Sequence, residues 1–134
     1  MRVVIDTNVI VSGLLNPFKA PGRIVMMAAA GELELCYDGR ILAEYREVLC
    51  RSKFRFDKDD IGDLLHQIEA FGYVTVSKPL NHSLPDRNDE PFLEVALASG
   101  VTCLITDNMK HYAVKTRQGM QVLSPAQFLT KHYS

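Results

Sequence analysis

The sequence has few of the features that mark secreted and membrane-spanning proteins. Cysteine occurs only three times, at Cys36, Cys50 and Cys103. This odd number at wide spacings argues against a disulfide framework or a zinc site, and each thiol lies in an apolar stretch, which predicts buried, reduced side chains. The start MRVVID reaches an acid too early for a secretion signal, and no apolar run is long enough to span a membrane. We therefore expect a cytoplasmic protein without a membrane partner.

An excess of either charge is also lacking, because the formal net charge is −1. The whole molecule is therefore not a polyanion binder by bulk charge, and the distribution of charge matters more. The basic side chains that we single out as candidates to bind an RNA backbone are Arg51, Lys53, Arg55, Lys110 and Lys115. An acidic centre flanked by such patches suits an enzyme that acts on a phosphodiester through a metal ion, and a solvated basic surface is the alternative.

The 134 residues favour one domain that spans residues 1–134. Continuous apolar segments alternate with amphipathic ones. We expect strands at residues 2–6, 33–37, 73–76, 101–106 and 120–124. We expect helices at residues 9–15 and 23–30, after Asp38-Gly39, from the acids at 57–60 to near Gly72, at 91–99, and after a capping box at 124–127. The segments between them, including 20–22, read as loops. This alternation predicts the α/β class: a Rossmann-like three-layer sandwich with a roughly five-stranded parallel sheet between helices.

Acidic side chains fall where such a sheet binds ligands, outside the carboxyl ends of its strands. Asp6 ends the first strand and Asp107 the fourth, whereas Asp89 begins the helix before that fourth strand. Each acid alone has an ordinary explanation: Asp6 and Asp89 as helix caps, and Glu44 as a surface partner of Arg40. Acids that converge in one crevice repel each other unless a divalent cation or a shared proton relieves the repulsion.

Four segments of the chain, taken in order, resemble the PIN-domain family. They are VVIDTNVIVSGLL, ILAEYREVLCRSKF, LPDRNDEPFLEVALASG and LITDNMKHY. The branch described as toxin components of toxin–antitoxin pairs looks nearest. The resemblance covers nearly the whole chain. It implies a parallel sheet of about five strands between helices and, for the members with activity, a metal-dependent ribonuclease with an acidic pocket.

The resemblance also implies which residues form the site. It places the catalytic and metal-binding carboxylates on Asp6, Glu44 and Asp89, with Mg²⁺ or Mn²⁺ as the cofactor. Asp86 is then a nearby acid outside the primary set. The side chains expected to orient water or ligands are Thr7, Asn8, Thr106, Asp107 and Asn108.

The end of the fourth strand departs from the family pattern. Many members place their last acid two residues after the threonine that ends this strand, and here Thr106 is followed by Asp107 and then Asn108. We expect Asn108 to point into the pocket and Asp107 to be the poorer ligand, which would favour one tightly bound metal ion over two. A small shift of the turn, with Asp107 as the ligand, is the alternative.

The resulting hypothesis is hydrolysis of RNA by the toxin of a toxin–antitoxin pair, with a small antitoxin as partner and self-association into a homo-oligomer. One alternative is a catalytically weak PIN-like binding module that acts through a protein partner, which the amide of Asn108 favours. Another is a phospho-accepting receiver domain. That class uses an adjacent acidic pair after the first strand, where this chain has Asp6, Thr7 and Asn8.

Overall fold

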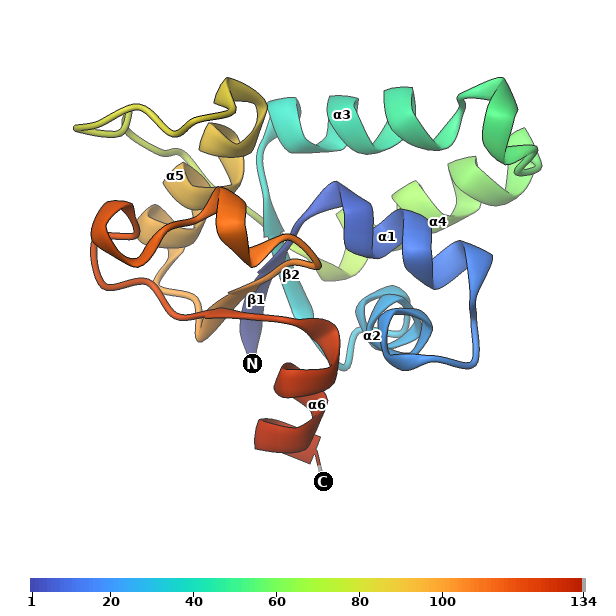
Figure 1. Cartoon of the computed structure of the whole chain (residues 1–134). Helices are drawn as coiled ribbons and strands as arrows, with labels where there is room; N and C mark the ends of the chain where they lie inside the picture. Colours follow the sequence, from blue (N-terminus) through green and yellow to red (C-terminus); the bar gives the residue numbers. More distant parts are fainter. Residues whose placement is uncertain (134) are drawn as a thin grey trace.

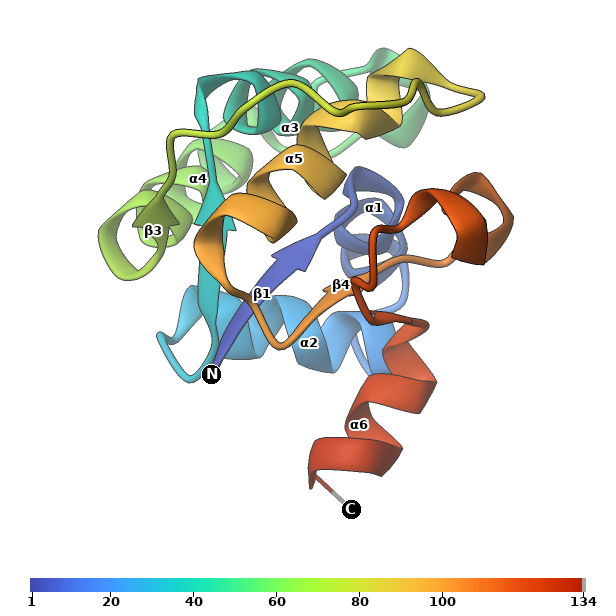
Figure 2. The same ribbon diagram turned by 90° about the vertical axis from the view of Figure 1, so that its left-hand side faces the viewer.

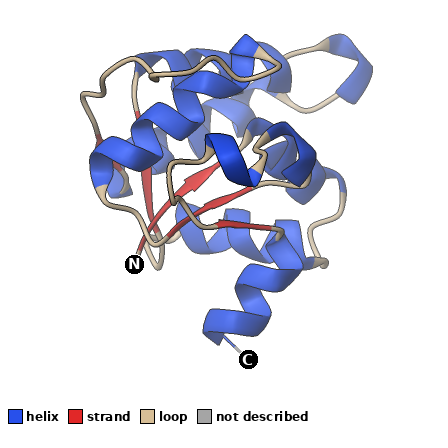
Figure 3. Ribbon diagram, turned by 60° about the vertical axis from the view of Figure 1, so that its left-hand side comes forward, coloured by secondary structure: helices blue, strands red, loops and turns tan. Residues whose placement is uncertain are grey.

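A five-stranded sheet, with every strand parallel to its neighbours, lies at the centre of the computed structural model, which describes residues 1–133. The strand order is β3-β2-β1-β4-β5. The strands are β1 Arg2–Ile5, β2 Glu34–Tyr37, β3 Tyr73–Val74, β4 Cys103–Ile105 and β5 Val122–Leu123. Each lies within the range predicted for it, and the predicted α/β class is confirmed (Figure 3).

Six α-helices separate and flank the strands in the described chain. They are α1 Thr7–Leu15, α2 Ala20–Ala29, α3 Gly39–Leu49, α4 Lys58–Phe71, α5 Glu90–Ser99 and α6 Pro125–Tyr133. Short 3₁₀ turns lie between these elements, at η1 Ser52–Phe54, η2 Arg87–Asp89, η3 Met109–His111 and η4 Val114–Thr116. The predicted capping box is present, because Ser124 Oγ accepts from Gln127 N and Ser124 N donates to Gln127 Oε1.

Helices cover both faces of the sheet, as predicted for a three-layer sandwich. On one face α5 contacts β1, β2 and β4, and Figure 2 shows it in front of β1 with α2 behind. The opposite face carries α1, α2 and α4, with α6 against α2. α3 runs along the top of the view in Figure 1 and contacts α1, α4 and α5. Among residues 1–133, none of the helices combines the length and apolar character needed to cross a membrane.

Two local predictions were wrong. Residues 20–22, predicted as loop, form the first turn of α2, because Pro21 lies where a missing N–H costs nothing and its fixed φ suits a helix. Gly22 is needed there, since a Cβ would lie 2.2 Å from the carbonyl oxygen of Pro17. Among the thiols, Cys36 and Cys103 are buried strand residues as expected, whereas Cys50 is exposed because it follows the last turn of α3.

The register of the central strands brings two strand ends side by side. β1 pairs with β4 so that Ile5 lies opposite Ile105, and both side chains are fully buried. The next residues, Asp6 and Thr106, therefore leave the sheet together at its carboxyl edge. The chain runs outward from β1 to β2 and β3 and then returns to β4 on the other side of β1. This junction is the topological switch point at which open parallel sheets bind ligands.

Candidate metal centre

Asp6 is a buried carboxylate at this switch point. Its Oδ2 atom accepts hydrogen bonds from Thr106 Oγ1 at 2.8 Å and from Tyr112 OH at 3.2 Å. Burial raises the pKa of the Asp6 carboxyl above its usual range, and the bonds from Thr106 and Tyr112 oppose that rise. Two hydroxyls thus orient a carboxylate that has little contact with water.

Neither Asp6 nor Asp89 serves as an ordinary helix cap. Asp6 occupies the N-cap position of α1 and Asp89 that of α5, but neither side chain makes a capping hydrogen bond. By contrast, Asp38 at the start of α3 accepts from Ile41 N at 3.0 Å. The structure therefore does not support the capping explanation for Asp6 and Asp89.

Glu44 lies on α3 and faces α1. Its Oε2 atom accepts a hydrogen bond from Thr7 Oγ1. Burial raises the pKa of Glu44, the bond from Thr7 opposes the rise, and the charges of nearby Asp6 and Asp86 add to it. The alternative explanation, a surface pair of Glu44 with Arg40, is not supported, since Arg40 binds Asp38 and Glu94 instead. Glu44 thus lies near enough to the other acids for their charges to act on it.

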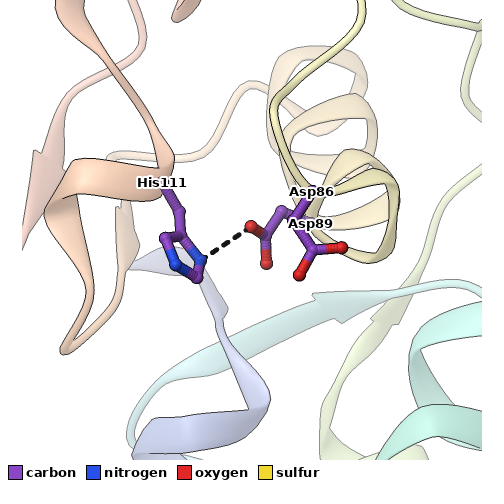
Figure 4. A group of neighbouring side chains, drawn as sticks. All are labelled: Asp86, Asp89 and His111. Carbon is purple, nitrogen blue, oxygen red and sulfur yellow. Dashed lines mark ion pairs between the residues drawn. The ribbon is translucent and has the colours of Figure 1, made fainter.

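The closest gathering of ligand atoms involves Asp86, Asp89 and His111, which offer one atom each within 4.8 Å of one another. Figure 4 shows the two aspartates, which precede α5, beside His111 on the turn after β4, with the Asp89 carboxylate directed at the imidazole. The Oδ2 atom of Asp89 lies 2.9 Å from His111 Nδ1. Asp6 and Glu44 are outside this group. The structure therefore places Asp86 in the tightest cluster, although the sequence suggested that it stands apart.

Asp89 is the most strongly perturbed of these acids. The residue is 8% exposed, and its Oδ2 atom forms an ion pair with His111 Nδ1. Burial raises the pKa of Asp89 to about 6, helped by the charge of Asp6 and opposed by His111. A buried carboxylate whose ionised form is disfavoured in this way is one that a nearby cation would stabilise.

Asn108 and Asp107 point to different partners. The side-chain Nδ2 of Asn108 lies 2.9 Å from His111 Nε2, and its backbone N–H donates to Thr106 Oγ1 at 3.0 Å. Asp107 is exposed and accepts from Ser12 Oγ at 3.1 Å, while its backbone N–H donates to Asn8 Oδ1. Asn108 is thus tied to the histidine of the cluster, and Asp107 is tied to α1.

The basic candidates fall in two places. Lys110 and Lys115 are exposed on η3 and η4, in the segment that carries His111. Arg51 and Lys53 lie beyond the end of α3, where Arg51 pairs with Glu47. Arg51 follows Glu44 by seven positions, which is roughly 10 Å along a helix. Arg55 is exposed beside them, with a left-handed backbone.

A cavity of about 440 Å³ lies elsewhere, between the segment 76–81 and α5. Its lining includes Glu94, whose carboxylate binds Arg40 and the backbone N–H of Leu80. None of the acids predicted as ligands lines it. The chemistry of the crevice therefore rests on its charged groups and not on an enclosed volume.

Two contributors to the crevice were absent from the predicted ligand set. His111 follows Asn108 by three positions, and residues three apart lie on the same side of a 3₁₀ turn. This spacing after Asn108 is the sequence feature that could have identified His111. Tyr112 is fully buried and reaches Asp6 across the fold. No local pattern marks Tyr112, because its partner is distant in sequence.

The crevice fits a divalent cation on the evidence of its donors. Carboxylate oxygens are the ligands that Mg²⁺ and Mn²⁺ prefer, and Asp6, Glu44 and Asp89 lie near enough for their charges to interact. The charges of Asp6 and Asp86 also raise the pKa values of both Glu44 and Asp89. Such mutual repulsion is what a bound cation relieves.

The fold and the crevice define a class of protein: a parallel α/β domain with an acidic site at the carboxyl edge of its sheet. A family model described as PIN domain matches residues 2–110, and the chain belongs to the PIN-domain family. The predicted resemblance is thereby confirmed at the level of the family. PIN domains are typically metal-dependent nucleases. No curated protein matches the chain significantly.

Proposed function

We propose that this protein is a ribonuclease that depends on Mg²⁺ or Mn²⁺ held by Asp6, Glu44 and Asp89. The observation that carries the proposal is the buried carboxylate of Asp89, whose pKa is raised by burial and by the nearby charge of Asp6, in a PIN-family chain. When bound, the metal ion would supply an activated water and stabilise charge on the phosphate. The acids would otherwise repel each other in a poorly solvated site.

The chain's own residues would hold and orient these ligands. Thr106 and Tyr112 fix the Asp6 carboxylate, and Thr7 fixes that of Glu44. Asn8 and Asn108 brace the turn after β4 through Asp107 N and His111. Because the donors to Asp6 and Glu44 are neutral hydroxyls, these two carboxylates are oriented without a paired cation of the protein.

Basic residues near the crevice would hold the RNA backbone. Lys110 and Lys115 flank the turn that carries His111, and Arg51, Lys53 and Arg55 would extend the track along α3. Contacts of this kind position a nucleic acid without reading its sequence. On the resemblance of the four motifs, we also propose a small antitoxin partner and self-association.

The decisive experiment is cleavage of a labelled single-stranded RNA by purified protein in Mn²⁺ or in EDTA. We expect cleavage by the wild type in Mn²⁺, and none in EDTA or with Asp89→Asn. Asp63→Asn is the matched control, because Asp63 is an exposed acid on α4, and it should cleave like the wild type. Cleavage that survives both EDTA and Asp89→Asn would reject the site.

The second candidate is a binding module that no longer turns over RNA. It is favoured by Asn108, which contacts His111 and brings no charge at the position of the family's last acid. Binding of Mn²⁺ by the wild type without cleavage of any RNA would select this function over the nuclease.

A further inference from the structure

Two neighbouring cavities lie outside the acidic crevice, along the segment 75–81 that runs from β3 toward α5 (Figure 2). Their volumes are about 440 and 350 Å³, within the range of ligand pockets. The residues that line both are Val76, Lys78, Pro79 and Glu94. We propose that these cavities form a subsite for one nucleotide of the RNA strand, with the base against α5 and a phosphate on Lys78. The inference rests on the proposed function and adds where the strand runs beyond the metal ion.

The cavities lie at the same edge of the sheet as the acidic crevice. Asp38 and Thr75 line the smaller cavity and directly follow β2 and β3, as Asp6 follows β1. The carboxyl ends of parallel strands share one edge of a sheet. On α3, Arg40 of the smaller cavity and Glu44 of the crevice are four positions apart, which is roughly 6 Å along the helix and on one side of it. A strand bound at the crevice can therefore reach the cavities.

The larger cavity has the walls that a base requires. Its apolar side chains, which would cover the faces of a planar ring, are Val76, Pro79, Leu80, Leu97 and Ala98. The amides of Asn81 and Gln118 also line it, and each offers a donor and an acceptor, as the edges of bases do. Single-stranded RNA presents such unstacked bases to proteins. A flat ring with polar edges therefore suits this cavity better than a purely apolar ligand.

Lys78 supplies a positive charge that no acid of the described chain pairs with. The side chain is exposed, and the residue lines both cavities. By contrast, the Glu94 carboxylate is fully engaged, because Oε1 accepts from Arg40 at 2.7 Å and Oε2 accepts from Leu80 N at 3.0 Å. Glu94 thus shapes the wall between the cavities, and Lys78 is the group that would bind a phosphate.

Thr75 gives an independent reason to expect a polar occupant. The residue is 8% exposed, and its hydroxyl has no hydrogen-bond partner among residues 1–133. A buried hydroxyl in this condition costs free energy. Ser77 lines the same cavity, where its Oγ atom accepts from Arg40 at 3.2 Å. Ribose hydroxyls both donate and accept, so they are the groups of a nucleotide that would satisfy these two side chains.

The test is a titration of the full chain, labelled with ¹⁵N, with the four nucleoside 5′-monophosphates in EDTA, so that metal-dependent cleavage does not interfere. At least one nucleotide should shift the amide signals of Leu80, Leu97 and Gln118 and leave those of Asp6 and Glu44 in place. Ribose 5-phosphate lacks the base and should bind at least about 10-fold more weakly. Equal binding of ribose 5-phosphate, or no shift at the three cavity residues, would overturn the proposal.

Two exposed positions test the base and the phosphate separately. Ala98→Phe fills the larger cavity and should weaken nucleotide binding at least about 10-fold, whereas Ala70→Phe, at an exposed alanine of α4, should not. Lys78→Gln should weaken binding of nucleotides and of ribose 5-phosphate alike, by about 10-fold. Lys58→Gln, at an exposed lysine of α4, is its control. Wild-type affinity in both Ala98→Phe and Lys78→Gln would reject the subsite.

Short RNA separates a subsite for a strand from a site for a free nucleotide. A trinucleotide should bind more tightly than its monophosphates, because its further phosphates reach the basic residues near the crevice. Tighter binding of a monophosphate than of any trinucleotide would overturn the assignment to the RNA strand.

The two proposals fail separately. If the protein cleaves RNA in Mn²⁺ but nucleotides leave the signals of Leu80 and Leu97 in place, the nuclease stands and the subsite falls. If nucleotides shift these signals but no RNA is cleaved, the subsite stands and the nuclease falls.

Discussion

Thr106 Oγ1 donates a hydrogen bond to Asp6 Oδ2 at 2.8 Å, and so ties the end of β4 to the end of β1. The same hydroxyl oxygen accepts from Asn108 N at 3.0 Å. One threonine therefore orients the central carboxylate and shapes the turn that leads to His111. The side chain is fully buried, so water cannot replace it in either role.

Replacing this hydroxyl should damage both stability and metal binding. Thr106→Val keeps the shape but removes a donor to a buried carboxylate, which should lower the free energy of unfolding by roughly 1–3 kcal/mol. Mn²⁺ affinity should also fall, because Asp6 loses a fixed orientation. Urea unfolding and calorimetric titration measure the two effects. Thr102→Val, at an exposed threonine just before β4, should change neither.

Removing the charge of Asp6 should have opposite effects with and without metal. Burial already disfavours the ionised form of Asp6 by raising its pKa, so Asp6→Asn should stabilise the metal-free protein. Mn²⁺ binding should be lost or greatly weakened. Thermal melts in EDTA and a Mn²⁺ titration test this pair. Equal Mn²⁺ affinity in mutant and wild type would remove Asp6 from the site.

The raised pKa of Asp89 predicts an unusual pH dependence. This pKa moves from 3.8 to about 6 on folding, so between these values the folded state binds more protons than the unfolded state. The free energy of unfolding therefore falls as the pH rises through this window. Without metal, the midpoint of thermal unfolding should be higher near about pH 5 than near about pH 7.

The variant Asp89→Asn isolates this contribution. It lacks the titrating group, so its melting temperature should depend less on pH over the same range. Circular dichroism melts of both proteins in EDTA give the comparison. Parallel pH profiles for wild type and variant would contradict the assigned pKa.

The contacts in the turn after β4 lead to different predictions for Asp107 and Asn108. Asp107 is exposed and bound to Ser12, so Asp107→Asn should leave Mn²⁺ affinity nearly unchanged. Asn108→Asp adds a carboxylate near the acids and should strengthen Mn²⁺ binding. Calorimetric titration of both variants decides the matter. Loss of binding in Asp107→Asn would mean that Asp107 is a ligand after all.

The salt dependence of RNA binding tests which basic residues contact the RNA backbone. Removing one phosphate contact should lower the slope of log affinity against log salt by about one. We expect this for Lys110→Ala, which lies beside His111, and for the double variant Arg51→Ala/Lys53→Ala. Measurement with catalytically silent Asp89→Asn protein avoids cleavage. An unchanged slope in either case would exclude that patch from the RNA path.

Local patterns in the sequence were sufficient to predict most of the fold. The runs VVI and CLI are buried on both faces as β1 and β4, because a parallel sheet covered by helices demands continuous apolar strands. Residues 20–22 were mistaken for loop because proline and glycine begin a helix as readily as they break one. The observed start of α2 depends on Gly22 meeting Pro17, a contact that composition does not show.

Local sequence patterns predict less of the candidate site than of the fold. The sequence points to Asp6 and Asp89 as candidates because they lie at the ends of predicted elements. The cluster with Asp86 and His111 depends on how the segment before α5 approaches the turn after β4, which the sequence does not specify locally. The contact of Tyr112 with Asp6 spans 106 positions. Only the complete tertiary structure brings such partners together.

This long span has a consequence for the order in which the site is made. Asp6 emerges early in synthesis, but its two hydroxyl donors follow 100 and 106 positions later. Domains fold as units during translation, and distant pairings of parallel strands form slowly. A nascent chain that stops before β4 therefore carries Asp6, Glu44 and Asp89 without the groups that orient them. Unfinished polypeptides on the ribosome would hold the acids of the site but not the assembled pocket.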